Sequence, residues 1–109
     1  HSTIYAIGGG QAIVHAHPRH AIALTLALPA GERFTPVDFE GQLHLTDVPV
    51  ITAGPMLLEQ VAVALQSRLV CIVRGHGAYA RGQTLWEALH WITALEESAH
   101  IAHIRGNGS

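Results

Sequence analysis

The sequence is poor in charged residues. Asp, Glu, Lys and Arg together make up only 13% of its 109 residues, which is about half of the usual share for a soluble domain. A globule of this size has a large surface to cover with polar groups. We therefore expect part of the surface to be covered by the rest of a larger domain, by neighbouring subunits, or by both.

Other shortages argue against several classes of protein. There is no run of cationic residues, which argues against nucleic acid or an anionic membrane as the partner. The longest apolar stretch, residues 21–30, contains Thr25 and is too short to cross a bilayer. The single cysteine, Cys71, gives no disulfide framework. It lies in the apolar run 69–73, where we expect a buried core thiol, and its isolation fits a reducing cytoplasm.

The two ends of the sequence suggest a fragment. The first residue is His1 rather than Met, and the last four residues read Gly-Asn-Gly-Ser. We therefore expect the sequence to be part of a longer protein.

Apolar periodicity and the positions of Gly and Pro predict alternating strands and helices. We expect strands at residues 12–17, 48–51, 69–73 and 78–80. We expect helices at residues 19–28, from residue 54 onwards and at residues 84–104, with residues 1–7 as the end of another helix. The alternation indicates an α/β or α+β class with layered helices.

Local signals refine some of these elements. Pro49 favours a position near a sheet edge for its strand. Gly54-Pro55 should open a helix with Pro55 at its first position, and Thr84 with Glu87 forms a capping box. We expect the buried stripe of the helix after Pro55 to be Leu58, Val61, Ala62 and Leu65. Residues 32–47 are ambiguous, with alternatives of a short helix starting at 36–38 and a strand at 43–45.

Histidine, in contrast, is abundant, with nine residues dispersed along the chain. His15 and His17 end the first expected strand, where residues two apart point to the same face. Their Cα atoms would lie about 6.6 Å apart, so both imidazoles can converge on one transition-metal ion such as zinc. A bare His-x-His pair is also a common chance arrangement.

His76 follows an apolar strand and is flanked by Gly75 and Gly77, which permit a sharp turn and close backbone approach. A metal ligand and a core histidine with a hydrogen-bond partner both fit this position. Three histidines from two strand ends would make a catalytic zinc site with an open fourth position.

These segments resemble, in the same order, those of the class II aldolase/adducin family. Residues 12–18 are similar to its His-x-His segment, and residues 70–77 to its strand followed by His-Gly. Residues 82–88, with Glu96 and Ala99, resemble its later helix. The match covers nearly the whole chain. It implies that residues 1–109 are a partial domain, lacking its N-terminal part, of a layered α/β/α fold around a mainly antiparallel central sheet.

The resemblance also implies an enzyme. The activity would be that of a metal-dependent lyase that cleaves ketose phosphates by retro-aldol chemistry, with a small sugar phosphate as substrate. The metal ligands would be His15, His17 and His76, and the cofactor Zn²⁺ or another divalent transition metal. The protein would be a cytoplasmic homotetramer of carbohydrate metabolism. The family's catalytic glutamate, its phosphate-binding loops and a C-terminal tyrosine would lie beyond these residues, so no catalytic residue is assigned.

Several alternatives stay open. The same scaffold supports ribulose-phosphate 4-epimerases and methylthioribulose-phosphate dehydratases, and adducin-like members are non-catalytic interaction domains. Three filled histidine positions argue against the last of these. A relic that binds metal without turning over sugar is a further alternative. His20 could support the metal site or serve packing, and we interpret His44, His90, His100 and His103 as surface or subunit-contact residues. We interpret Glu32, Asp38, Glu40 and Asp47 as solvated loop charges.

Overall fold

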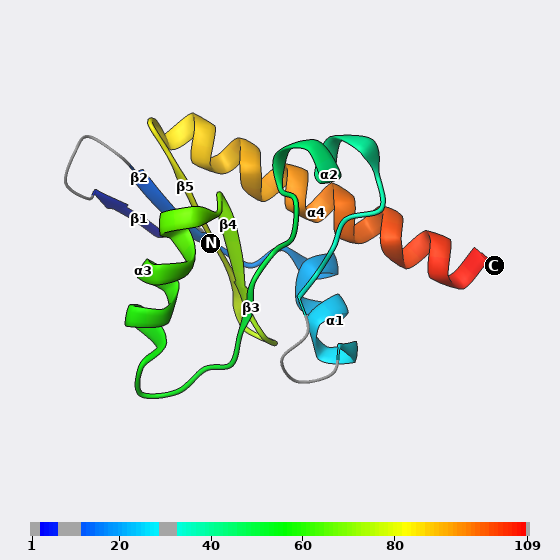
Figure 1. Ribbon diagram of the computed structural model, residues 1–109, viewed down its shortest axis with the longest axis horizontal. Coiled ribbons are helices and arrows are strands. Elements are labelled where there is room, and N and C mark those ends of the chain that lie inside the picture. The colour runs from blue at the N-terminus through cyan, green and yellow to red at the C-terminus, as the bar shows by residue number, and fades with distance from the viewer. Residues whose placement is uncertain (1–2, 7–11, 29–32, 109) are drawn as a thin grey trace.

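The computed structural model describes residues 3–6, 12–28 and 33–108. Its centre is a five-stranded sheet with the order β1-β2-β5-β4-β3 (Figure 1). The strands are β1 (Thr3–Ala6), β2 (Ala12–Ala16), β3 (Val50–Ile51), β4 (Val70–Val73) and β5 (Gly77–Gly82). The pairs β1–β2, β2–β5 and β4–β5 are antiparallel, and β3 runs parallel to β4. The expectation of a mainly antiparallel sheet is confirmed, as is the edge position of the strand that follows Pro49.

Helices cover both faces of this sheet. They are α1 (Arg19–Ala27), α2 (Phe39–His44), α3 (Leu57–Ser67) and α4 (Leu85–Gly108). The helices α1 and α4 pack on one face, with α2 against α4, and α3 packs on the opposite face over β3, β4 and β5. In Figure 1, α4 runs along the length of the molecule and α3 stands apart from it. The layered α/β/α arrangement is therefore confirmed.

Strand alternation divides the core into two clusters. Val14, Ile72 and Ala80 point toward α1 and α4, where Leu95 is fully buried among them. The side chains of opposite parity form a second cluster under α3, made of Cys71, Val73, Val61 and Leu65. Burial raises the pKa of the Cys71 thiol to about 12, against a smaller opposite effect of a hydrogen bond to the Tyr79 backbone. The expected buried core thiol is confirmed.

The expected helix end at residues 1–7 is wrong where the structure describes it. Residues Thr3–Ala6 form β1, which pairs with Ala12–His15 of the neighbouring strand. Thr and Ile are β-branched and Tyr is aromatic, and residues of these kinds favour strands. Pairing with β2 also supplies backbone hydrogen-bond partners that a single helical turn lacks. Residues 1, 2 and 7 lie outside the described ranges.

The helix expected from Gly54-Pro55 begins later than predicted, at Leu57. Residues 54–56 form a turn in which Gly54 C=O accepts the Leu57 N–H. Val61 and Leu65 are buried as expected, whereas Leu58 is 71% exposed. Ala62 is also exposed. Leu57 and Ala64 pack against the cluster in their place, so the observed stripe is rotated about the helix axis relative to the expected one.

Two short-range predictions concern helix starts. The expected start of a short helix at 36–38 is confirmed, since the Asp38 carboxylate accepts the Gly41 N–H at 2.9 Å and caps α2. The strand alternative at 43–45 is wrong, since the first two of these residues lie in α2. The capping box before α4 is confirmed in part. The Thr84 hydroxyl accepts the Glu87 N–H at 3.1 Å, but the Glu87 carboxylate accepts from Gln83 rather than from Thr84.

Among the helices of the described ranges, none combines the length and the apolarity that a membrane span requires.

Candidate metal site

His15 and His17 lie side by side at the end of β2. The register sets His15 opposite Tyr79 of β5. The two rings stack at a centroid distance of 4.3 Å with an interplanar angle of 25°. The His17 ring meets the His15 ring edge-on at 4.9 Å. Strand alternation therefore brings the two imidazoles together on the face of the sheet that α3 covers only in part.

His76 lies in the turn between β4 and β5. Its N–H donates to the Val73 carbonyl at 2.9 Å, which closes the turn. Gly75 adopts a φ of +72°, a left-handed conformation that favours glycine. The His76 side chain is exposed. The predicted turn is confirmed, and it presents His76 at the same end of the sheet as the strand end of β2.

Gly77 is where the turn touches the histidine pair. A Cβ atom on this residue would lie 3.0 Å from His15 Cε1 and 3.2 Å from His17 Cδ2. It would also lie 2.6 Å from the Ala16 carbonyl oxygen. Only a residue without a side chain lets the chain pass this close to both rings, so the glycine places His76 one residue away from the pair.

A backbone hydrogen bond orients the His15 ring. Its Nδ1 lies 3.1 Å from the Ala78 carbonyl oxygen. A carbonyl only accepts, so Nδ1 carries the proton and Nε2 keeps its lone pair. Burial lowers the pKa of His15, and His17 lowers it further, while the bond to Ala78 acts in the opposite direction. His15 is therefore held as a neutral imidazole with Nε2 available as a ligand.

The donor chemistry of these residues fits a divalent transition metal. Neutral imidazole nitrogens suit zinc and similar ions, and the missing side chain at Gly77 lets the backbone next to His76 approach both rings. In the ranges 3–6, 12–28 and 33–108, no three His, Cys, Asp or Glu side chains are already arranged around one point as a metal set. The structure thus brings the His15 and His17 rings together and sets the His76 backbone beside them. The three side chains do not yet surround one point.

The other histidines lie elsewhere. His44 lies 3.3 Å from Glu40 within α2. His90 contacts Trp91 on α4. His20 lies between α1 and α4, where its ring stacks on that of His100 at 4.2 Å.

The contact between His20 and Glu96 was missed by sequence reasoning. The Glu96 carboxylate lies 2.7 Å from His20 Nδ1. The two residues are 76 positions apart, and only the match of Glu96 to the family's later helix singled it out.

The acidic residues of the ambiguous segment have structural partners of their own. Asp47 pairs with Arg33 and, at 2.7 Å, with Arg68. Burial acts to raise the pKa of this carboxyl, but the Arg68 hydrogen bond and the charges of Arg33 and Arg68 outweigh it and leave the pKa below its ordinary value. Asp38 caps α2. Glu32 lies outside the described residues. None of the described ones is assigned a catalytic role.

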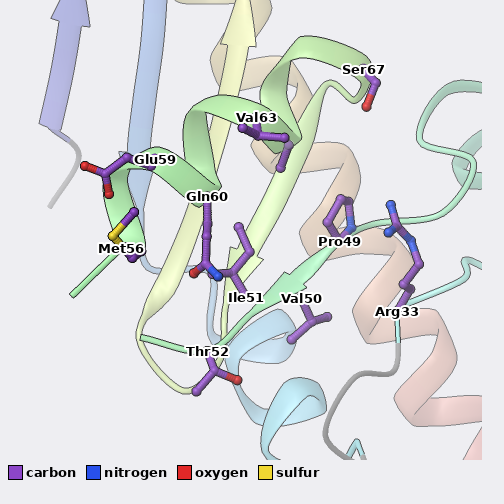
Figure 2. A pocket seen from close by; sticks show the side chains of 11 residues that line it. Arg33, Pro49, Val50, Ile51, Thr52, Met56, Glu59, Gln60, Val63 and Ser67 are labelled. Carbon is purple, nitrogen blue, oxygen red and sulfur yellow. The ribbon is translucent and has the colours of Figure 1, made fainter. Parts of the chain in front are cut away.

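A hollow of about 780 Å³ lies between β3 and α3, separate from the histidine site. Figure 2 shows Pro49 and Val50 on one side of it, with Gln60 and Val63 of α3 on the other. No histidine of the described ranges lines it. A smaller hollow of about 390 Å³ adjoins the His17 segment and includes Glu96 of α4. Because imidazole is a side chain that suits a transition-metal ion, the candidate site is placed at the β2 end and not in the larger hollow.

Comparisons with known proteins agree with this fold. The profile of the Class II Aldolase and Adducin N-terminal domain matches residues 1–103. The crystal structure of L-fuculose-1-phosphate aldolase from Thermus thermophilus is 41% identical, with a TM-score of 0.78, over 90% of this chain and 56% of its own. Another L-fuculose 1-phosphate aldolase structure is 25% identical, with a TM-score of 0.77, over 90% of this chain and 47% of its own.

A more distant structure shares the fold alone. The sugar-phosphate aldolase from Thermotoga maritima is 21% identical, with a TM-score of 0.75, over 90% of this chain and 46% of its own. No curated protein matched the sequence. The chain spans about half the length of these three structures. Since the family profile covers nearly all of its residues, the chain belongs to the class II aldolase and adducin family.

Proposed function

We propose that this chain forms the metal-binding part of a metal-dependent lyase that cleaves ketose phosphates by retro-aldol chemistry. Family membership and the likeness to L-fuculose-1-phosphate aldolase support the reaction and the substrate class. One observation carries the proposal. Gly77 brings the β4–β5 turn against both His15 and His17, and His76 is the residue that directly precedes it.

The proposed ligands of a divalent ion such as Zn²⁺ are His15, His17 and His76. The bond from His15 Nδ1 to the Ala78 carbonyl leaves Nε2 as the donor atom, and partners of this kind orient metal-binding histidines in proteins. Stacking on Tyr79 holds the plane of the His15 ring. The exposed His76 side chain would turn toward the pair to complete the set.

Three histidine ligands suit the proposed chemistry. They leave a fourth position of a tetrahedral ion open for substrate. When bound, the ion would polarise the substrate carbonyl and stabilise the negative charge that develops as the carbon–carbon bond breaks. The bond to Ala78 already orients His15, whereas the His76 side chain would have to turn toward the pair before the set is complete.

We also propose that the protein works in the cytoplasm as a homo-oligomer, with a tetramer as the expected form. Large apolar side chains support burial by other subunits or by further parts of the domain. Trp86 is 76% exposed, Phe39 73% and Ile104 56%. Because the chain also has few charged residues, exposure of these apolar side chains to water is unfavourable.

Metal analysis tests the ligand assignment. We expect about one zinc ion per chain in the full-length protein, measured by elemental analysis after dialysis, because three imidazoles form a catalytic-type site. The variants His15→Ala and His76→Ala should lose most of this metal. His90→Ala is the matched control, because His90 is exposed on α4, on the far face of the sheet from His15. A well-folded wild type without metal would overturn the assignment.

Product analysis tests the reaction. Incubation with a panel of ketose phosphates should release two shorter carbonyl compounds if the protein is an aldolase. Conversion to a stereoisomer without cleavage would instead indicate an epimerase, and loss of water a dehydratase. Metal binding without turnover of any substrate would favour a relic that binds metal but does not catalyse the reaction.

A further inference from the structure

We propose that Glu96 and Thr25 are positioning residues that act through α1 to hold the three candidate ligands in place. The inference rests on the proposed function and names residues that support the metal site without touching the ion. It starts from an unusual helix terminus. α1 begins directly after the His15–Pro18 segment, its N-cap residue Pro18 offers no side-chain cap, and its first turn contains no acidic residue. The free N–H groups of that turn therefore need partners from elsewhere.

Glu96 of α4 supplies these partners. Its Oε2 accepts the His20 N–H at 2.9 Å, and its Oε1 accepts the Ala21 N–H at 3.0 Å. The same Oε2 lies 2.7 Å from His20 Nδ1. A carboxylate at this position satisfies two free donors and also complements the positive end of the helix dipole. The start of α1, and with it the His17-Pro18 segment, is thereby tied to α4.

Thr25 connects the other end of α1 to the turn that carries His76. Thr25 is fully buried. Its hydroxyl donates to the Ile22 carbonyl at 2.8 Å and accepts the Gly75 N–H at 3.3 Å. Leu26 packs against the same glycine, since a Cβ on Gly75 would lie 3.0 Å from Leu26 Cδ2. The last turn of α1 therefore holds the residue immediately before His76.

α1 thus links both sources of ligands. One end continues from His17, and the other contacts the residue before His76. A nine-residue helix is a stiff rod of about 13 Å, so a shift at either end changes the separation of the two strand ends. Zinc–nitrogen bonds lie within a narrow range near about 2.0–2.1 Å. Small shifts of this rod should therefore reduce metal affinity before they unfold the protein.

A purely structural role makes a different prediction. If Glu96 only caps a helix, its loss lowers the free energy of unfolding and leaves the metal affinity of the folded molecules unchanged. If Glu96 positions the ligands, the affinity of the folded protein falls as well. Metal affinity and stability must therefore be measured on the same variants.

The experiment uses Co²⁺ as the probe, bound to the metal-free full-length protein and followed by its visible absorption. The variants are Glu96→Ala, Glu96→Gln, Thr25→Val and Thr25→Ser. We expect Glu96→Ala and Thr25→Val to weaken Co²⁺ binding by about tenfold and to alter the absorption spectrum, as loss of supporting partners does at other metal sites. Thr25→Ser keeps the hydroxyl and should restore the wild-type affinity.

Glu59→Gln is the control for loss of a carboxylate. Glu59 is exposed on α3 and lines the hollow that contains no candidate ligand, so its substitution should leave both affinity and spectrum unchanged. The proposal is overturned if Glu96→Ala and Thr25→Val lower the melting temperature while the folded protein keeps its Co²⁺ affinity and spectrum. If Glu96→Ala does not fold, Glu96→Gln and the Val/Ser pair at position 25 decide in the same way. A wild type that binds no Co²⁺ would defeat the proposed function itself, whereas unchanged variants of a Co²⁺-binding wild type defeat only the positioning role.

Discussion

The two faces of the sheet are built from the same strands but differ in how they are covered. On one face, side chains such as Val14 and Ile72 are fully buried beneath α1 and α4. On the other face, α3 covers Cys71 and Val73, while His15 and Tyr79 of the neighbouring strands are only partly buried. One face therefore supplies a continuous core and the other carries the candidate site.

This difference shows how a small domain accommodates both packing and chemistry. Because side chains alternate along a strand, His15 can be partly accessible while Val14 and Ala16 on either side of it are buried. The buried neighbours hold the histidine backbone in a rigid strand. The other face is covered only in part, so His15 and Tyr79 remain partly accessible.

The largest effect is expected on the face of the sheet that α1 and α4 cover. Leu95→Ala removes a fully buried side chain of α4, and we expect a loss of about 2–5 kcal/mol in the free energy of unfolding, measured by urea denaturation. Leu58→Ala is the control on the opposite face. Leu58 is 71% exposed, so the change should stay within about 0.5 kcal/mol. Equal losses from the two variants would contradict the burial of Leu95 between α4 and the sheet.

A smaller effect is expected on the histidine face. Gly77→Ala places a Cβ atom 2.6 Å from the Ala16 carbonyl oxygen and 3.0 Å from His15 Cε1. We expect a loss of about 1–3 kcal/mol in stability, together with reduced zinc content, because β2 and β5 must separate. Gly54→Ala is the control, since nothing lies within 4 Å of its added Cβ. Full zinc content and unchanged stability in Gly77→Ala would show that this close approach does not hold the site.

The smallest effect is expected for the ion pairs that Asp47 makes with two arginines. Asp47 connects Arg33 to Arg68, which follows α3. Because its pKa is lowered in the folded protein, its contribution is present above the unfolded pKa of about 4 and is lost as the pH falls through the folded value. We expect Asp47→Asn to cost about 1 kcal/mol or less at pH 7.

Denaturation at several pH values checks this sign. The stability difference between wild type and Asp47→Asn should be constant near neutral pH and shrink as the pH falls below about 4. A difference that grows on acidification would mean that the carboxylate is not stabilised by the two arginines.

Local patterns in the sequence predicted much of the fold. The strand 12–16, the helix that follows it and the apolar strand 70–73 follow from periodicity and from Gly and Pro positions, which act over a few residues. The error at Thr3–Ala6 arose because Ile4, Tyr5 and Ile7 suit a helix face as well as a strand. Pairing with β2 decided between them. The misplaced stripe on α3 arose because several sets of apolar residues in this helix fit a 3.6-residue period, and packing on the sheet selected the one with Leu57 and Ala64.

The candidate site, too, was predicted in part from local patterns and in part depends on tertiary contacts. Alternation alone predicts that His15 and His17 share a face, and the glycines beside His76 predict a turn. The contact of Gly77 with both rings depends on the register of β2 against β5. Glu96 caps α1 through the backbone N–H groups of His20 and Ala21, which precede it by 76 and 75 positions in the sequence. No local pattern contains such a distance.

Residue types and their order along the chain were enough to predict three histidines as candidate ligands, a glycine-flanked turn beside one of them, and an apolar strand that buries the only cysteine. How these residues are held depends on packing. The folded chain sets His15 against Tyr79 and the Ala78 carbonyl, and it supplies α1 with a carboxylate from a helix far along the sequence. Residue type and periodicity act within a few residues, whereas strand register and helix capping across the fold depend on contacts that form only when distant segments pack together.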